Sequence, residues 1–352
     1  MKTKPLLIML AIFFGFALLS AGAWGAGKGA LVVKGTPDDD FMEVTGTDGD
    51  DVIKVTAGKG DDLILYECTP GNDVVTVDGG AGFDVLLVKA NGQNYTVKDN
   101  KGNVIHQEGT GGTLITVKNV EKILWGDFPT ETVNEGTEGE DTQIDLGTPE
   151  PDFIMQFGYG GKDTQYVSGA DGNDWLVQLG GPGDDNLNIR AGTGNDFIYQ
   201  SGGSGNDTMF AEGGDGDDWI FQSGGAGNDD LTAIGGFGND YIIQKGGDGD
   251  DKIRCDAGEG DDNVSIDAGP GNDTITYDVS AGVDQVSIDG GKGCDELTIN
   301  GGSQSLTLLD KKRRVLYQQG AGGSVITVLN VEYIVVLGPD GVVLFQWGAP
   351  CP

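Results

Sequence analysis

Aspartate recurs at a fixed spacing of 11 residues along two stretches of the chain. Fourteen copies run in phase from Asp152 to Asp295, and five earlier copies run from Asp40 to Asp84. Each aspartate closes a glycine-rich loop, such as Gly202–Asp207. Carboxylates are hard oxygen ligands, and glycine lets backbone carbonyls turn inward beside them. This combination predicts binding of Ca²⁺, which accepts six to eight oxygen ligands.

The spacing also gives a reason for a metal. If successive loops stack as parallel strands do, equivalent carboxylates lie about 4.8 Å apart and repel one another unless cations lie between them. If one ion lies between each pair of neighbouring loops along every edge of the two arrays, the upper limit is about 15 calcium ions. Zinc is disfavoured, because the chain has one histidine and no cysteine cluster. The predicted ligands are Asp40, Asp51, Asp62, Asp73, Asp84, Asp163, Asp174, Asp185, Asp196, Asp207, Asp218, Asp229, Asp240, Asp251, Asp262, Asp273 and Asp295. The loops before Asp152 and Asp284 fit the pattern poorly, so these two are left out.

The residues between the loops indicate the elements that position them. The second residue after nearly every aspartate is apolar, as at Leu187 and Ile198, which fits a short strand with alternating inward and outward side chains. The fourth residue alternates in type, with Gln178, Ile189 and Gln200 in succession. The true period is therefore 22 residues. We predict an all-β fold, a parallel β-roll or β-solenoid with two strands per 22-residue turn.

The loops resemble the RTX, or haemolysin-type, calcium-binding repeat, whose pattern is Gly-Gly-x-Gly-x-Asp-x-apolar-x. The resemblance covers residues 35–88 and 147–299. In that family the chain winds as a parallel β-roll with two strands per turn, and Ca²⁺ is held between successive loops. This chain departs from the family by using 11 residues instead of nine, with an unchanged loop and a longer strand. The resemblance implies the same metal site in a wider roll.

The chain contains two copies of one plan. Residues 109–121 match residues 320–332 at an offset of 211, and each match follows one of the aspartate arrays. We predict a calcium β-roll module with a β-rich cap at 24–125, a linker at 126–146, and a second such module with a cap at 147–352. A solenoid needs caps to cover its terminal core and strand edges. Glu121 and Glu332 lie outside the repeat and are predicted to stabilise the caps. Of the four cysteines, Cys294 and Cys351 could pair, or all four could remain thiols.

The N-terminus has the pattern of a signal peptide at 1–23. Lys2 and Lys4 precede an apolar run at 6–19, and a small-residue cleavage pattern ends at Ala23. We therefore expect a secreted protein, extracellular or at the cell surface. The sequence has no second long apolar run, so we predict no membrane span. The formal net charge of −35 disfavours nucleic acid as a partner.

One predicted sheet has an unusual outer face. The first and third residues after each aspartate should point outward, and on this sheet they are apolar or aromatic over five layers. Three interpretations compete: an interface with a second copy or with the first module's own apolar face (Phe41, Leu63, Leu65, Val85 and Leu87), a platform for sugar rings, or inverted packing with the aromatics inside. Large exposed apolar patches usually mark interfaces. The aromatic residues concerned are Phe153, Trp175, Phe197, Tyr199, Trp219, Phe221 and Tyr241.

No set of residues predicts catalysis. His106 is the only histidine, and no serine or cysteine motif accompanies it. The many carboxylates are already explained by the repeat, so we do not expect an enzyme. The sequence favours an extracellular structural, adhesive or assembly component that folds on binding Ca²⁺. The alternative is an extracellular carbohydrate-binding module that uses the aromatic face to bind a surface polysaccharide.

Overall fold

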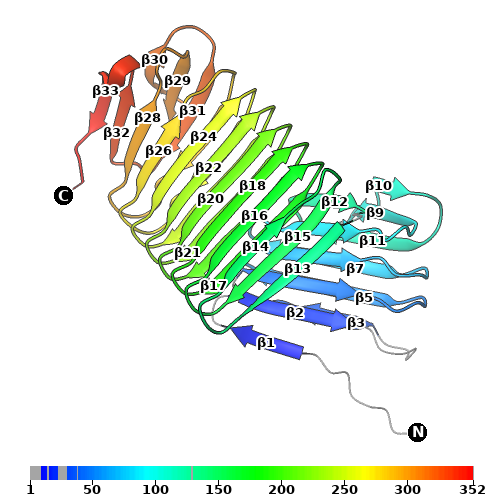
Figure 1. Cartoon of the computed structure of the whole chain (residues 1–352). Helices are drawn as coiled ribbons and strands as arrows, with labels where there is room; N and C mark the ends of the chain where they lie inside the picture. Colours follow the sequence, from blue (N-terminus) through cyan, green and yellow to red (C-terminus); the bar gives the residue numbers. More distant parts are fainter. Residues whose placement is uncertain (1–8, 14–15, 23–29, 38, 128–129, 352) are drawn as a thin grey trace. The chain divides into compact units, whose positions relative to one another are not determined.

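The computed structural model describes residues 9–13, 16–22, 30–37, 39–127 and 130–351. In these ranges every regular element is a β-strand, apart from one short 3-10 helix at Pro339–Gly341. The chain divides into two compact units, Met1–Phe128 and Pro129–Pro352. Both are parallel β-solenoids with two strands per 22-residue turn, as predicted (Figure 1).

The first unit consists of two six-stranded sheets. Their strand orders are β1-β2-β4-β6-β8-β12 and β10-β9-β11-β7-β5-β3. Inward side chains from both sheets, including Met42, Ile64 and Val77, form its core. The strands are β1 (Met9–Phe13), β2 (Phe16–Gly22), β3 (Leu31–Lys34), β4 (Asp40–Thr45), β5 (Val52–Lys59), β6 (Leu63–Glu67), β7 (Val74–Ala81), β8 (Val85–Lys89), β9 (Tyr95–Asp99), β10 (Val104–Glu108), β11 (Thr113–Lys118) and β12 (Lys122–Gly126).

The second unit is longer. Its eleven-stranded sheet has the order β13-β15-β17-β19-β21-β23-β25-β27-β31-β29-β30, and its ten-stranded sheet has the order β14-β16-β18-β20-β22-β24-β26-β28-β32-β33. Successive turns stack like the rungs of a ladder (Figure 1). The strands are β13 (Thr130–Thr137), β14 (Thr142–Leu146), β15 (Asp152–Tyr159), β16 (Thr164–Asp171), β17 (Trp175–Pro182), β18 (Asn186–Thr193), β19 (Phe197–Ser204), β20 (Thr208–Asp215), β21 (Trp219–Ala226), β22 (Asp230–Phe237), β23 (Tyr241–Asp248), β24 (Lys252–Glu259), β25 (Asn263–Asp267), β26 (Thr274–Asp278), β27 (Gln285–Asp289), β28 (Glu296–Asn300), β29 (Leu306–Asp310), β30 (Val315–Gln319), β31 (Ser324–Leu329), β32 (Tyr333–Leu337) and β33 (Val343–Gly348).

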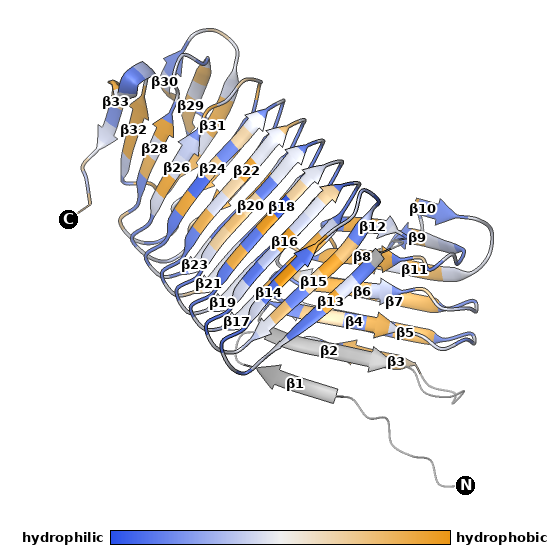
Figure 2. Ribbon diagram, viewed as in Figure 1, coloured by the Kyte–Doolittle hydropathy of each residue, from blue (hydrophilic) through white to orange (hydrophobic). Residues whose placement is uncertain are grey.

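The register places equivalent residues of neighbouring turns side by side. Ile198 pairs with Ile220, and Gln200 pairs with Gln222. The apolar residue two positions after each aspartate therefore enters the core, as at Ile198 and Ile220. In Figure 2, bands of like hydropathy cross several strands of this unit, as this register requires.

The glutamines form a ladder inside the second unit, so the inverted-packing interpretation is wrong. Gln200 is fully buried. Its amide nitrogen Nε2 donates to Gln178 Oε1 at 2.8 Å and to the carbonyl oxygen of Phe210 at 3.1 Å. Gln222 repeats both bonds one turn further on. Each buried amide is thus bonded along the ladder and across to the opposite sheet, which removes the cost of burying it.

The two caps confirm the duplication. The hairpin β9–β10 and the hairpin β29–β30 begin and end at residues that differ by the predicted offset of 211. Glu121 Oε2 accepts the N–H of Asp84 at 2.9 Å, and Glu332 Oε2 accepts the N–H of Asp295 at 3.0 Å. These glutamates therefore stabilise the caps, as predicted. Cys294 and Cys351 form a disulfide, with their Cα atoms 5.6 Å apart.

One predicted boundary changes. Residues 130–146, which the sequence analysis places in a linker, form the first turn of the second unit, because β13 pairs with β15 and β14 pairs with β16. This turn escaped detection because Thr130 stands where the repeat has an aspartate, and Gln143 stands where it usually has an inward apolar residue. The predicted signal peptide overlaps β1 and β2, and its remaining residues lie outside the described ranges. Across the described residues, no helix is long and apolar enough to span a membrane.

Candidate metal-binding columns

The repeated aspartates lie in buried columns along the edges of the solenoids. Asp207, Asp229 and Asp251 belong to successive turns of one column, and each has an exposed fraction of at most 2%. The N–H of Asp207 donates to Asp229 Oδ1 at 2.7 Å, and the N–H of Asp229 donates to Asp251 Oδ1 at 2.8 Å. One oxygen of each interior carboxylate is therefore used to tie its loop to the loop before it.

The second carboxylate oxygen is left without a partner through most of each column. In the described part of the chain, fourteen aspartates have a buried Oδ2 atom with no hydrogen-bond partner. We call these the open aspartates. They are Asp62, Asp84, Asp163, Asp174, Asp185, Asp196, Asp207, Asp218, Asp229, Asp240, Asp251, Asp262, Asp273 and Asp295. Buried polar groups are almost always satisfied in proteins, so a repeated row of unsatisfied carboxylate oxygens indicates a missing partner.

Burial makes the charge on these groups costly. Desolvation raises the pKa of Asp207 to about 8, and the neighbouring carboxylates add to this, although the hydrogen bond from the backbone of Asp185 opposes it. Asp196 is raised to about 8 and Asp62 to about 9, again mainly by burial. A buried row of carboxylates can be stabilised by protons or by cations. At neutral pH a bound cation would restore the ionised form.

The glycines give the columns room for such an ion. A Cβ atom added to Gly202 would lie 2.3 Å from Asp207 Oδ2 and 2.7 Å from the carbonyl oxygen of Gly224. Gly224 repeats this arrangement with Asp229 Oδ2 and the carbonyl oxygen of Gly246, both at 2.4 Å. Beside each of these glycines a carboxylate oxygen and a backbone carbonyl oxygen therefore converge. These are the donor types that Ca²⁺ prefers.

The donor set differs from a cluster of acidic side chains. Within the described ranges, no group of three or more histidine, cysteine, aspartate or glutamate side chains is placed to hold a metal. A calcium ion here would combine one or two carboxylates with backbone carbonyls, and water would complete its shell. The residues fit calcium and disfavour a metal that needs nitrogen or sulfur ligands.

A second ladder runs along the rim of the loops, and the sequence analysis missed it. The residue just before each repeated aspartate is usually Asn or Asp. The N–H of Asn206 donates to Asp184 Oδ1 at 2.8 Å, and the N–H of Asn228 donates to Asn206 Oδ1 at 2.9 Å. These side chains accept from the next loop, whereas the repeated aspartates accept from the preceding loop. Together the two ladders fix the loop backbone in both directions.

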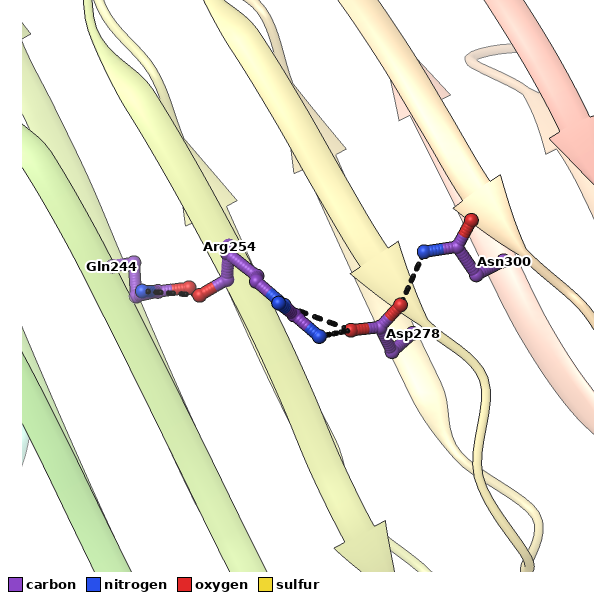
Figure 3. A network of polar contacts seen from close by, with 4 residues as sticks. All are labelled: Gln244, Arg254, Asp278 and Asn300. Carbon is purple, nitrogen blue, oxygen red and sulfur yellow. Dashed lines mark hydrogen bonds and ion pairs between the residues drawn. The ribbon is translucent and has the colours of Figure 1, made fainter. Parts of the chain in front are cut away.

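Polar residues also connect the outside of the ten-stranded sheet to the glutamine ladder. Figure 3 shows Gln244 donating to the carbonyl oxygen of Arg254, at 3.1 Å. The Arg254 guanidinium donates to Asp278 Oδ2 through Nε at 3.0 Å and Nη2 at 2.7 Å, and Asn300 donates to Asp278 Oδ1. Arg254 is thus held on the outer face of the ten-stranded sheet, where the neighbouring Lys252 of β24 is also exposed.

Not every predicted ligand is open. Asp40, Asp51 and Asp73 lie in the columns as predicted, but their Oδ2 atoms accept hydrogen bonds from the protein itself. The same holds for Asp141, Asp152 and Asp284, which were not among the predicted ligands. We call these six the closed aspartates.

The aromatic side chains of the second unit follow the predicted register. Trp175 pairs with Phe197, and Phe197 pairs with Trp219. Tyr199 stacks on Phe221 with ring centroids 4.9 Å apart, and Trp219 stacks on Tyr241 at 4.1 Å. Phe153, Trp175, Phe197, Tyr199 and Phe221 point away from the core of their own solenoid. The partner of this face stays a prediction.

Comparison with known proteins adds no name to this arrangement. No protein-family model matches the chain, and no curated protein matches it.

Proposed function

We propose that this protein binds calcium along its aspartate columns and acts as a secreted structural or adhesive component that folds on binding the ion. The observation that carries the proposal is the row of fourteen buried carboxylate oxygens without a partner. The net charge of −35 makes the uncompensated chain strongly self-repelling, which divalent ions would relieve. The resemblance of the loops to haemolysin-type calcium repeats supports the same conclusion.

The proposal is for a structural role. A solenoid turn contacts mainly its neighbours, so ions bound between loops would stabilise the stack turn by turn. Secretion would place the protein where calcium is plentiful. The alternative of a sugar-binding platform rests only on the outward aromatic side chains of the eleven-stranded sheet, which stack on one another.

Circular dichroism of the full chain tests the proposal. Calcium should increase the β-sheet signal of metal-stripped protein at pH 7.5, and excess EGTA should reverse the change. Magnesium serves as the control cation, because it demands compact octahedral geometry and gives up its water reluctantly. An unchanged spectrum and no bound calcium by equilibrium dialysis would overturn the proposal.

A further inference from the structure

The open and closed aspartates differ at one position of the loop, four residues before the aspartate. In all fourteen open loops this residue has a positive φ angle. It is glycine in twelve of them, and Tyr159 and Ala170 take the same conformation, with φ of 68° and 84°. In the six closed loops it is threonine or serine, and its φ is not positive. The conformation of one residue thus separates the two classes.

The physical reason is the direction of an N–H group. In the closed loop of Asp141, the N–H of Thr137 donates to Asp141 Oδ2 at 2.5 Å, and the Thr137 hydroxyl donates to the same oxygen at 2.8 Å. In an open loop, the positive φ turns this N–H away. The N–H of Gly247, four residues before Asp251, instead donates to the carbonyl oxygen of Ala268 at 3.1 Å.

At two closed aspartates a tyrosine hydroxyl donates to Oδ2, and at Asp284 it does so while Ser280 Oγ has no hydrogen-bond partner. Tyr277 Oη donates to Asp284 Oδ2 at 2.9 Å, and Ser324 Oγ donates to the same oxygen at 2.9 Å. At the equivalent place in the first unit, 211 residues earlier, Tyr66 Oη donates to Asp73 Oδ2 at 3.1 Å. In the preceding turn of the second unit, the position of Tyr277 is taken by the smaller Cys255, and Asp262 is open. Hydroxyl groups therefore satisfy the carboxylate where the column ends.

We propose that the residue four positions before each repeated aspartate decides whether that aspartate binds calcium: a left-handed residue leaves a cation site, whereas a threonine or serine without positive φ leaves the carboxylate accessible to N–H and hydroxyl donors of the protein. The inference rests on the proposed calcium function and narrows it to the fourteen open aspartates. Cations would then occupy the interior turns, while the first turn of each unit and one edge of its last turn are closed by hydrogen bonds. In the other column of each unit the last aspartate, Asp84 or Asp295, stays open.

Matched substitutions on one edge test the loss of a site. Asp262 is open, and Asp284 is the closed aspartate one turn further along the same column. In equilibrium dialysis of the full chain, Asp262→Asn should lower the number of bound calcium ions by at least one. Asp284→Asn keeps the Oδ1 acceptor for the N–H of Asp262 and should leave the number unchanged. Equal losses from both variants would overturn the inference.

A gain of a site is the stricter test. Thr137→Gly gives the loop before Asp141 the sequence pattern of the interior loops, with glycine both five and four residues before the aspartate. It should add one bound calcium ion, because the N–H and hydroxyl donors to Asp141 Oδ2 are both lost. Thr137→Val is the control, because it removes the hydroxyl but keeps a backbone that favours negative φ. It should add none.

The outcomes separate this inference from the function beneath it. If the unaltered protein binds no calcium, the proposed function fails and the inference fails with it. If the unaltered protein binds calcium but Thr137→Gly adds none while remaining folded by circular dichroism, only the inference fails. If Thr137→Gly unfolds the first turn, the Asp262 and Asp284 pair decides alone.

Discussion

The two units share one plan but differ in how far they satisfy their own carboxylates. Twelve of the fourteen open aspartates belong to the second unit, and only Asp62 and Asp84 belong to the first. The positions four residues after the aspartates differ too. They carry the glutamine ladder in the second unit and apolar residues such as Val44 and Val77 in the first. A short solenoid can be closed at both ends by its own hydroxyls and caps. A long solenoid has more interior turns, and there the carboxylate Oδ2 atoms have no hydrogen-bond partner among the described residues.

The largest effect should follow removal of calcium. Chelation should expose the amides of the second unit to hydrogen exchange and leave most of the first unit protected. When free calcium is at 100 times the dissociation constant of a site, that site adds about 2.7 kcal/mol to the free energy of unfolding. This corresponds to about 100-fold in exchange protection. Hydrogen exchange with mass spectrometry on the full chain measures both units at once. Equal loss of protection in the two units would contradict the expectation that the second unit depends more strongly on calcium.

The second effect concerns pH in the absence of calcium. Burial raises the pKa of Asp196 and Asp207 from 3.8 to about 8, so between these values the folded state binds more protons than the unfolded state. Stability of the metal-free protein should therefore be greatest near pH 4 to 5 and fall as pH rises toward 8. Saturating calcium should remove this fall, because the ion replaces the proton. Urea unfolding at pH 5 and pH 8, each with calcium or EGTA, checks the sign.

A smaller effect should come from single loop glycines. Gly205 has φ of 138°, and a Cβ atom there would lie 1.5 Å from the carbonyl oxygen of Gly183 in the preceding turn. Gly205→Ala should therefore cost about 1–3 kcal/mol locally. Gly139→Ala is the matched control, because Gly139 holds the equivalent place in the loop before Asp141 and a Cβ atom there would meet only Thr137 Oγ1, at 3.7 Å. Limited proteolysis near the substituted residue should increase for the first variant and change little for the second.

A local effect of similar size should come from the glutamine ladder. Gln200→Leu keeps the volume but removes the donor to Gln178 Oε1 and the acceptor for Gln222 Nε2. Leaving buried amides unsatisfied should cost about 1–3 kcal/mol. Exchange protection should fall in β17, β19 and β21 and stay unchanged in the first unit. A loss spread evenly over the chain would contradict the local, turn-by-turn stability of the solenoid.

Much of the fold could be predicted from the sequence, because a period of 22 residues fixes both the number of strands per turn and which residues face inward. The columns of aspartates followed directly from that period. The difference between Asp262 and Asp284 could not be predicted in the same way, since it depends on where the hydroxyls of Tyr277 and Ser324 lie in the folded chain. The signal was present as threonine or serine in place of glycine at 36, 47, 69, 137, 148 and 280. Only the φ angles show that these residues mark the closed loops.

The first turn of the second unit shows the other limit. Thr137 and Asp141 keep the loop chemistry, but the strands around them carry Val133 and Ile144 as exposed residues. An end turn has a neighbour on one side only, so its composition is less constrained than that of an interior turn. Periodicity therefore fades where the solenoid begins.

The most direct test is a crystal structure of the full chain grown with calcium, with anomalous difference density used to locate the ions. The account predicts density within about 2.6 Å of the Oδ2 atoms of interior aspartates such as Asp207 and Asp229. It predicts none within that distance of Asp73 or Asp284, whose oxygens are held by tyrosine hydroxyls. Calcium-saturated crystals with no density beside Asp207 and Asp229 would contradict the central claim.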